Sequence, residues 1–234
     1  MQRSKVGARQ YAPARVKSMS EMECRAGTLP HAELRHHQSA EQLMGMPASS
    51  ASERRYTLEE FERLRDAAPP GPRYEFLDGE ILVSPSPNRV HQRIVVRLTV
   101  LLEPFVRANG IGELVVSPFD VRFGDRRVFQ PDLLVASPED VRAGRKDAAR
   151  ELVLAVEIVA PGSARHDRVR KRPVYQEERV DELWLIDPES ELVERWTPET
   201  DRPEVLTEML IWAPAGTIDT LSIDLVALFA EAKR

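Results

Sequence analysis

Residues 152–159 constrain the fold of this chain more than any other segment. All of them are apolar except Glu157. Such a run is typical of a central β-strand that is covered on both faces. A carboxylate inside it is costly unless it is paired or bound to a metal ion. The segment therefore predicts a covered sheet that carries a polar site.

Two local signals mark the region before this run. Thr57 and Glu60 have the spacing of a capping box, which predicts the start of a short helix. The proline-rich residues 69–72 end that helix. Asp78-Gly79 lies between two alternating runs and predicts a β-hairpin over residues 74–83.

Hydrophobic periodicity indicates the remaining elements. Helical spacing is found at residues 88–109, weakly at 163–179, and at 223–233. Pro104 predicts a kink or an early end of the first of these helices. Strand patterns are found at residues 113–117, 120–123, 128–136, 182–186, 192–196 and 204–211, and residues 137–150 indicate a polar loop. This order predicts one α/β domain over residues 53–234, with a mixed central β-sheet flanked by helices.

Residues 1–52 differ from the rest of the chain. They contain few large apolar residues and show no sustained period, which predicts a disordered tail. The tail is alternatively a start-site artefact, because Met44 and Met46 offer later starts.

Composition bounds the compartment and the partners. The single cysteine, Cys24, fits a reducing cytoplasm. No apolar run approaches the ~20 residues of a membrane helix, so no membrane association is expected. The formal net charge of -5 argues against a protein that coats nucleic acid. It leaves room for an enzyme that grips its substrate with a local patch and a metal ion.

Asp132 and Glu157 are the first candidate site residues. Asp132 follows Pro131 at the start of a predicted buried strand, or at a bend within it. Two carboxylates supply the hard oxygen ligands that Mg²⁺ prefers. From position alone, Glu157 is either a metal ligand or the partner of Arg165 or Arg168 in a structural ion pair.

The charged segment that follows favours the metal interpretation. Asp167, Lys171 and Tyr175 are spaced i, i+4, i+8, so one helical face presents all three. A lysine there would place positive charge near a phosphodiester or orient the attacking water. The alternative is a solvated charged face. Pro173 lies either in the first turn of this helix or at a kink within it.

Two further residues have weaker signals. Glu75 alternates with Tyr74 and Phe76 on the first hairpin strand, so it points to the site or to solvent, with Glu80 as its competitor. His91 is a lone histidine near the start of a long helix, where it caps or packs; the 5 histidines show no zinc-ligand spacing. The chain has neither a nucleophile elbow nor a phosphate-cradling glycine-rich loop, which argues against a nucleophile-elbow hydrolase, an NTPase and a dinucleotide-binding enzyme.

Together these motifs resemble the Uma-two family of restriction-endonuclease-like proteins over about residues 56–199. The matching pieces are residues 74–80, 84–87, 91–92, 130–133, 156–161, 167–171 with Tyr175, and 182–188. The resemblance implies a PD-(D/E)XK nuclease core that binds Mg²⁺ or Mn²⁺, preceded here by an N-terminal helix and β-hairpin.

The resemblance also implies roles for individual residues. Asp132 matches the aspartate of the motif and Glu157 its second acid, so both are expected to bind metal. Val159 stands where the motif usually has lysine, and Lys171 would supply that lysine from the following helix. Glu75 would complete the ligand set. His91, Asp167 and Tyr175 are expected as accessory residues.

The sequence thus predicts a metal-dependent DNA endonuclease with Glu75, Asp132, Glu157 and Lys171 as catalytic residues. A homodimer is expected, because cutting both strands needs two sites; Trp196 and Trp212 are candidates for its interface or for the core. The alternative function is a nuclease-fold binding or regulatory module without catalysis.

Overall fold

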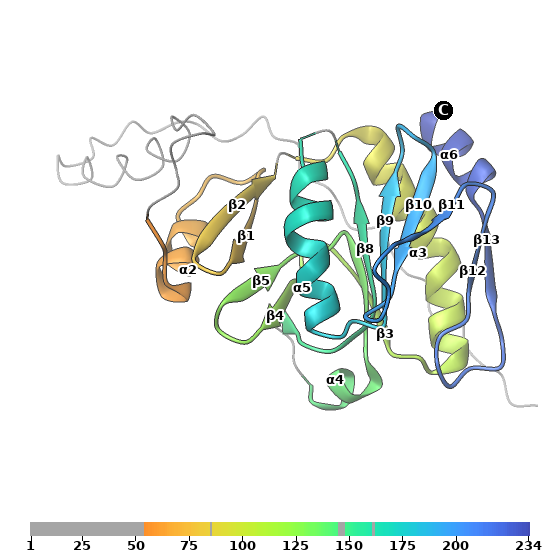
Figure 1. Cartoon of the computed structure of the whole chain (residues 1–234), viewed down its shortest axis with the longest axis horizontal. Helices are drawn as coiled ribbons and strands as arrows, with labels where there is room; N and C mark the ends of the chain where they lie inside the picture. Colours follow the sequence, from red (N-terminus) through yellow and green to blue (C-terminus); the bar gives the residue numbers. More distant parts are fainter. Residues whose placement is uncertain (1–53, 85, 145–147, 161) are drawn as a thin grey trace, which may run out of the picture. The chain divides into compact units, whose positions relative to one another are not determined.

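The computed structural model describes residues 54–84, 86–144, 148–160 and 162–234 (Figure 1). The disordered tail predicted over residues 1–52 lies outside these residues. The described helices are α2 (Leu58–Asp66), α3 (Arg89–Asn109), α4 (Pro138–Arg142), the π-helical segment η1 (His166–Lys171), α5 (Arg172–Glu177) and α6 (Leu225–Lys233). None of them is both long enough and apolar enough to cross a membrane.

The described strands are β1 (Arg73–Leu77), β2 (Glu80–Ser84), β3 (Glu113–Val116), β4 (Asp120–Phe123), β5 (Arg127–Phe129), β6 (Leu133–Ala136), β7 (Ala148–Ala149), β8 (Leu152–Ile158), β9 (Glu182–Asp187), β10 (Leu192–Trp196), β11 (Glu204–Leu206), β12 (Met209–Trp212) and β13 (Leu221–Asp224). The central sheet has the order β11-β10-β9-β8-β6-β3, and the hairpin sheet has the order β2-β1-β5-β4-β7. Strands β12 and β13 pair with each other.

The central sheet confirms the predicted mixed α/β architecture. Strand β8 pairs parallel with β9 and antiparallel with β6. It is therefore the covered inner strand that the apolar run predicts. Helix α3 lies against one face of this sheet and α5 against the other, and α2 with the β1–β2 hairpin precedes both helices in the chain (Figure 1).

Local signals explain where the first elements begin and turn. The Thr57 hydroxyl accepts a hydrogen bond from the Glu60 N–H at 3.2 Å, and the Glu60 carboxylate accepts one from the Thr57 N–H at 3.0 Å, which completes the capping box. Asp78 and Gly79 have φ angles of 50° and 90°, as a tight hairpin turn requires.

Helix α3 does not end at Pro104, so the expectation of an early end was wrong. A proline inside a helix leaves the carbonyl four residues earlier without its partner. Pro104 and Val100 both lie on the exposed face of α3, where water can satisfy that carbonyl. The helix ends at Gly110, which adopts the left-handed conformation with a φ of 61°.

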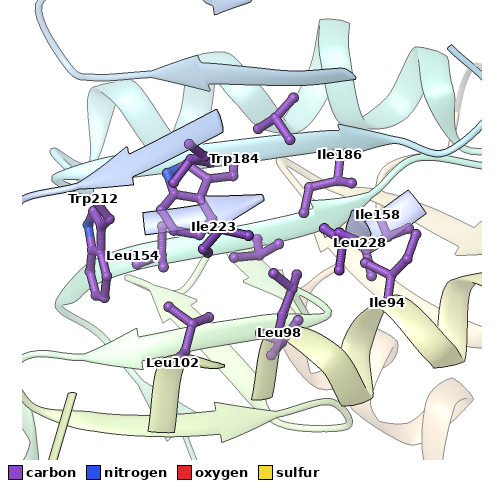
Figure 2. Close-up of a cluster of buried hydrophobic side chains, with 14 of the residues drawn as sticks. Ile94, Leu98, Leu102, Leu154, Ile158, Trp184, Ile186, Trp212, Ile223 and Leu228 are labelled. Carbon is purple, nitrogen blue, oxygen red and sulfur yellow. The ribbon is translucent and has the colours of Figure 1, made fainter. Parts of the chain in front are cut away.

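Side chains of β8 alternate between two apolar cores. Leu154, Val156 and Ile158 face α3 and α6 and pack in the core shown in Figure 2. Ala155 and Val159 face the opposite core, which includes Tyr175 of α5 and apolar residues of the hairpin sheet. Because strand side chains alternate, Glu157 shares the second face and points toward α5 and the hairpin sheet.

Trp196 and Trp212 are core residues in this structure. Both are buried, and Trp212 packs edge-on against Trp184 with ring centroids 5.6 Å apart (Figure 2). Of the two interpretations of these tryptophans, burial favours the core over an interface.

Two predicted strands are each divided between sheets. Residues 128–136 were expected to form one strand, but β5 belongs to the hairpin sheet and β6 to the central sheet. Pro131 lies between them and has no N–H to continue a ladder. Residues 204–211 divide in the same way, because β11 joins the central sheet while β12 pairs with β13.

Two further boundaries also differ from expectation. The predicted polar loop at residues 137–150 contains α4, whose first turn is capped by the Ser137 hydroxyl, and the short strand β7. The predicted helix at 223–233 begins later, because Leu221–Asp224 forms β13 and the Asp224 side chain caps α6 at the Ala227 N–H.

Candidate active site

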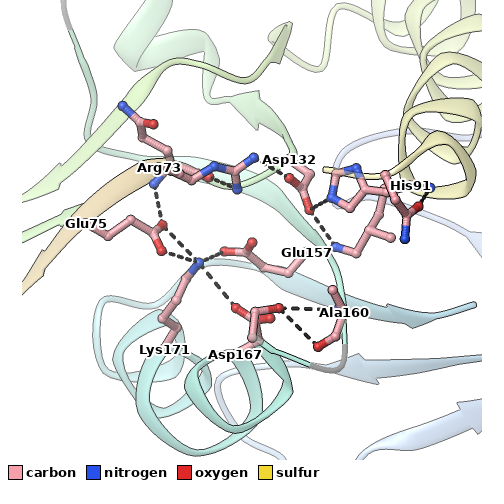
Figure 3. A network of polar contacts seen from close by, with 12 residues as sticks. Arg73, Glu75, His91, Asp132, Glu157, Ala160, Asp167 and Lys171 are labelled. Atoms are coloured by element: carbon pink, nitrogen blue, oxygen red, sulfur yellow. Dashed lines mark hydrogen bonds and ion pairs between the residues drawn. The ribbon is translucent and has the colours of Figure 1, made fainter. Parts of the chain in front are cut away.

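The four predicted catalytic residues come together between the two sheets. Glu75 lies on β1, Asp132 on the link from β5 to β6, Glu157 on β8 and Lys171 at the end of η1 (Figure 3). Each is at most 3% exposed, although all four are charged residue types. Buried charges require partners. Lys171 pairs with Glu75 and Glu157, and Arg73 pairs with Asp132.

Lys171 is the cation at the middle of this cluster. Its Nζ atom lies 2.9 and 3.1 Å from the two carboxylate oxygens of Glu75 and 2.6 Å from Oε1 of Glu157. Asp167, one helical turn earlier, lies 3.5 Å from the same atom. The ion-pair partner of Glu157 is thus Lys171, whereas Arg168 pairs with Asp187 and Glu194.

The π-helical segment explains how Pro173 fits before Tyr175. Arg172 N–H donates to the Asp167 carbonyl, five residues earlier, and Pro173 lies in the first turn of α5. A proline there needs no intrahelical donor. The predicted face survives, since Asp167 contacts Lys171 and the Tyr175 hydroxyl donates to Glu157 at 2.8 Å. Single π-helical turns are frequent at functional sites.

Asp132 is held on both of its oxygens. Oδ1 accepts a hydrogen bond from Arg73 Nη2 at 2.6 Å, and Oδ2 accepts one from the Ile158 N–H at 2.7 Å. His91 Nε2 lies 3.0 Å from the same Oδ2, so this histidine reaches the site. Burial alone would raise the pKa of Asp132, but His91 and Arg73 outweigh it and lower the pKa to about 2.

For Glu157, in contrast to Asp132, the effect of burial on the pKa is larger than the effect of the nearby cation. Burial raises its pKa to about 8; Lys171 acts against this rise, while Asp167, Glu75 and Asp132 add to it. Burial lowers the pKa of Lys171, yet Glu157, Glu75 and Asp167 raise it well above the ordinary value, so this lysine stays charged.

The donor set fits a divalent cation in kind and in charge. In the described part of the chain, buried carboxylates at the site outnumber the permanently charged cations Arg73 and Lys171. Carboxylate oxygens are ligands that Mg²⁺ accepts, and a divalent cation would neutralise the excess. Among the same residues, no three His, Cys, Asp or Glu side chains are grouped so that they could hold a metal ion, so a ligand set would require a rearrangement.

A pocket of about 310 Å³ opens beside Asp132. Arg73, His91 and Gln130 line it together with Asp132. The pocket gives a small polar ligand or a phosphate group access to the Asp132 side of the site. A second pocket, of about 320 Å³, is lined by other residues that include Asp181 and Trp212.

Arg73 and the contacts of Gln130 were not predicted from the sequence. Gln130 donates its N–H to Glu75 Oε1 at 2.8 Å, and its carbonyl accepts from Arg73 Nη1 at 2.7 Å. The signal for Arg73 was its position two residues before Glu75, which places both side chains on one face of β1. Glu80, the competitor of Glu75, instead pairs with Arg170 near the surface.

Comparisons with known proteins agree with this fold. The chain is similar to a crystal structure titled "putative nuclease belonging to DUF820 from Anabaena variabilis ATCC 29413", with a TM-score of 0.61 and 22% sequence identity over 75% of this chain and 98% of the other. This similarity shows the restriction-endonuclease-like fold. No curated protein matches the chain. A family model named Uma2, with the description "Putative restriction endonuclease", matches residues 58–220. This match spans most of the chain, which therefore belongs to the Uma2 family.

Proposed function

We propose that this protein is a metal-dependent nuclease that hydrolyses phosphodiester bonds in DNA. The observation that carries the proposal is the buried Lys171 ammonium, which contacts Glu75, Glu157 and Asp167 beside Asp132. Membership of the Uma2 family supports the nuclease class.

Asp132 and Glu157 are the proposed ligands of Mg²⁺ or Mn²⁺. They lie side by side, because the Asp132 N–H, just before β6, donates to the Val156 carbonyl of β8 at 2.9 Å and the Ile158 N–H donates to the Asp132 carboxylate. Glu75 approaches from β1 and completes the set. A bound divalent cation would polarise the phosphoryl oxygen and lower the pKa of a water molecule.

Lys171 is proposed to orient the attacking water and to stabilise negative charge that develops on the phosphate. Its raised pKa keeps it protonated, so it acts as a donor and a point charge and not as a base. Tyr175 and Asp167 are positioning residues, since the first donates to Glu157 and the second contacts Lys171. His91 positions Asp132.

The proposal is tested by incubating the full chain with supercoiled plasmid in Mg²⁺ or Mn²⁺. We expect Asp132→Asn, Glu157→Gln and Lys171→Met each to lower the rate of cleavage about a hundredfold or more, the usual loss when a group that stabilises the transition state is removed. Glu80→Gln is the matched control, because Glu80 lies on the same hairpin outside the site. Cleavage that is unaffected by Asp132→Asn would overturn the assignment.

We also propose that the protein acts on DNA as a homodimer in the cytoplasm. Cleavage of both strands of a duplex needs two sites, and the single Cys24 fits a reducing compartment. Light scattering of the purified full chain is expected to give twice the monomer mass; a monomer at every concentration would contradict this assembly.

A non-catalytic binding module is the second candidate. The observation that favours it is that both oxygens of Asp132 and both of Glu75 already have protein donors. A site completed by protein contacts needs no metal ion. In that case Mn²⁺ leaves the melting temperature unchanged, and replacing Lys171 and its acidic partners together by apolar residues of similar volume stabilises the fold, as replacing a buried ion pair by apolar groups often does. If metal binds at the site, the melting temperature rises with Mn²⁺ concentration and Asp132→Asn abolishes the rise.

A further inference from the structure

Arg73 occupies the oxygen of Asp132 that a metal ion could most readily reach. Its guanidinium donates to Oδ1 of Asp132 at 2.6 Å and to the Gln130 carbonyl at 2.7 Å (Figure 3). The other oxygen, Oδ2, accepts from the backbone N–H of Ile158, a donor that β8 holds in place, and contacts His91. Oδ1 is therefore the oxygen that a side-chain movement can release.

The surroundings of Arg73 allow such a movement. Its side chain is 19% exposed, whereas the Asp132 side chain is 3% exposed. Arg73 also lines the pocket of about 310 Å³ beside Asp132. A guanidinium binds carboxylate and phosphate with the same planar donor geometry. The Arg73 side chain thus has a carboxylate partner, Asp132, and borders a pocket where it could bind a phosphate group.

We propose that Arg73 exchanges partners during binding: it neutralises Asp132 in the metal-free protein and binds a phosphate of the nucleic acid once a divalent cation takes its place. This inference rests on the proposed function, because it takes Asp132 to be a metal ligand. Arg73 competes with the cation in the absence of substrate. It supports substrate binding only after the cation has arrived.

The exchange makes cation binding and phosphate binding interdependent. A cation releases the guanidinium for the phosphate, and the bound phosphate then keeps the guanidinium away from Oδ1, so that it no longer competes with the cation. Coupling between two binding events is reciprocal, so each ligand raises the affinity for the other by the same factor. Metal-free protein is expected to bind nucleic acid without help from Arg73.

The first test measures Mn²⁺ binding to the full chain by isothermal titration without nucleic acid. Arg73→Gln is expected to lower the Kd for Mn²⁺ about fivefold or more, the lower end of ordinary coupling between sites. Arg65→Gln is the matched control, since Arg65 forms a similar partly buried pair with Asp120 at 2.9 Å. An unchanged or raised Kd in Arg73→Gln would overturn the inference.

The second test measures the binding of a labelled phosphorothioate oligonucleotide, which resists hydrolysis, by fluorescence anisotropy. Without metal, Arg73→Gln should bind like the wild type; with Mn²⁺ it should bind about fivefold more weakly. If Arg73→Gln weakens oligonucleotide binding equally with and without Mn²⁺, Arg73 contacts phosphate permanently. If Arg73→Gln does not weaken binding in either condition, Arg73 does not contact the nucleic acid. Either result overturns the proposed exchange of partners. Arg73→Lys, which keeps the charge but not the planar fork, is the second variant and should retain only part of the coupling.

These tests also separate the inference from the proposed function. If Mn²⁺ binds the wild type and Asp132→Asn abolishes binding, the metal site stands whatever Arg73 does. If wild-type binding of Mn²⁺ does not depend on Asp132, the proposed metal site and the partner exchange both fail.

Discussion

Replacing Lys171 with methionine removes the ammonium group and keeps most of the aliphatic side chain. Three carboxylates would then lie buried without the cation they share, because Nζ is 2.9 Å from Glu75, 2.6 Å from Glu157 and 3.5 Å from Asp167. Removing one partner from a buried ion pair costs about 3–5 kcal/mol, mostly because the remaining charge is uncompensated. We expect Lys171→Met to lower the free energy of unfolding by that amount.

Urea denaturation of the full chain in EDTA measures this loss by linear extrapolation. Lys233→Met is the control, because the side chains of Lys233 and its partner Glu191 are 45% and 55% exposed. Such an exposed pair contributes about 0–1 kcal/mol. The difference between the two variants isolates the effect of burial.

Neutralising a carboxylate should restore part of the stability lost in Lys171→Met. We therefore expect the double variant Lys171→Met/Glu75→Gln to be more stable than Lys171→Met alone. A cost below about 1 kcal/mol for Lys171→Met, with no recovery in the double variant, would refute the reasoning that this lysine compensates buried carboxylates.

Three other changes have expected outcomes. The pKa of Glu157 is raised to about 8 from 4.5, so the folded protein keeps a proton that the unfolded chain releases. The free energy of unfolding of the metal-free protein should therefore fall as the pH rises from about 5 to 8. Urea denaturation of Glu157→Gln should show a smaller fall over the same pH range. Gly112→Ala should lower stability by roughly 2 kcal/mol or more in thermal melting, because Gly112 has a φ of 152° and an added Cβ would lie 1.9 Å from the Ala136 carbonyl oxygen. Leu98→Ala in the buried core should cost about 2–5 kcal/mol by urea denaturation.

Elements with local signals could be predicted from the sequence. The capping box at Thr57 and the Asp78-Gly79 turn depend on residues within one turn of chain, and the structure contains both. The apolar run around Glu157 reports its burial directly, because few other positions tolerate so many apolar residues in succession. These signals do not require knowledge of distant partners.

The division of residues 128–136 between two sheets could not be predicted in this way. Both halves are apolar, and their sheets are decided by strands far along the chain: β5 pairs with β1 and β4, and β6 with β3 and β8. Pro131 was visible as a possible break, but a bend within one strand explained it equally well. The division of residues 204–211 was missed for the same reason.

The candidate site shows the same limit. Carboxylates in apolar runs and the spacing from Asp167 to Tyr175 indicated Asp132, Glu157 and Lys171, which the structure brings together. The position of Arg73 two residues before Glu75 is a weak signal, because an arginine at the start of a strand is ordinarily exposed. Only the fold brings its guanidinium to Asp132, 59 residues away in sequence.

The central claim is that Asp132 and Glu157 bind a divalent metal ion. A crystal structure of the full chain with Mn²⁺, with an anomalous difference map that locates the metal, tests this claim most directly. We predict an anomalous peak bonded to carboxylate oxygens of Asp132 and Glu157 at about 2.1 Å, close to the distance that Mg²⁺ requires, with Arg73 displaced from Oδ1 of Asp132. An Arg73–Asp132 contact that persists at saturating Mn²⁺, with no metal between Asp132 and Glu157, would contradict the account.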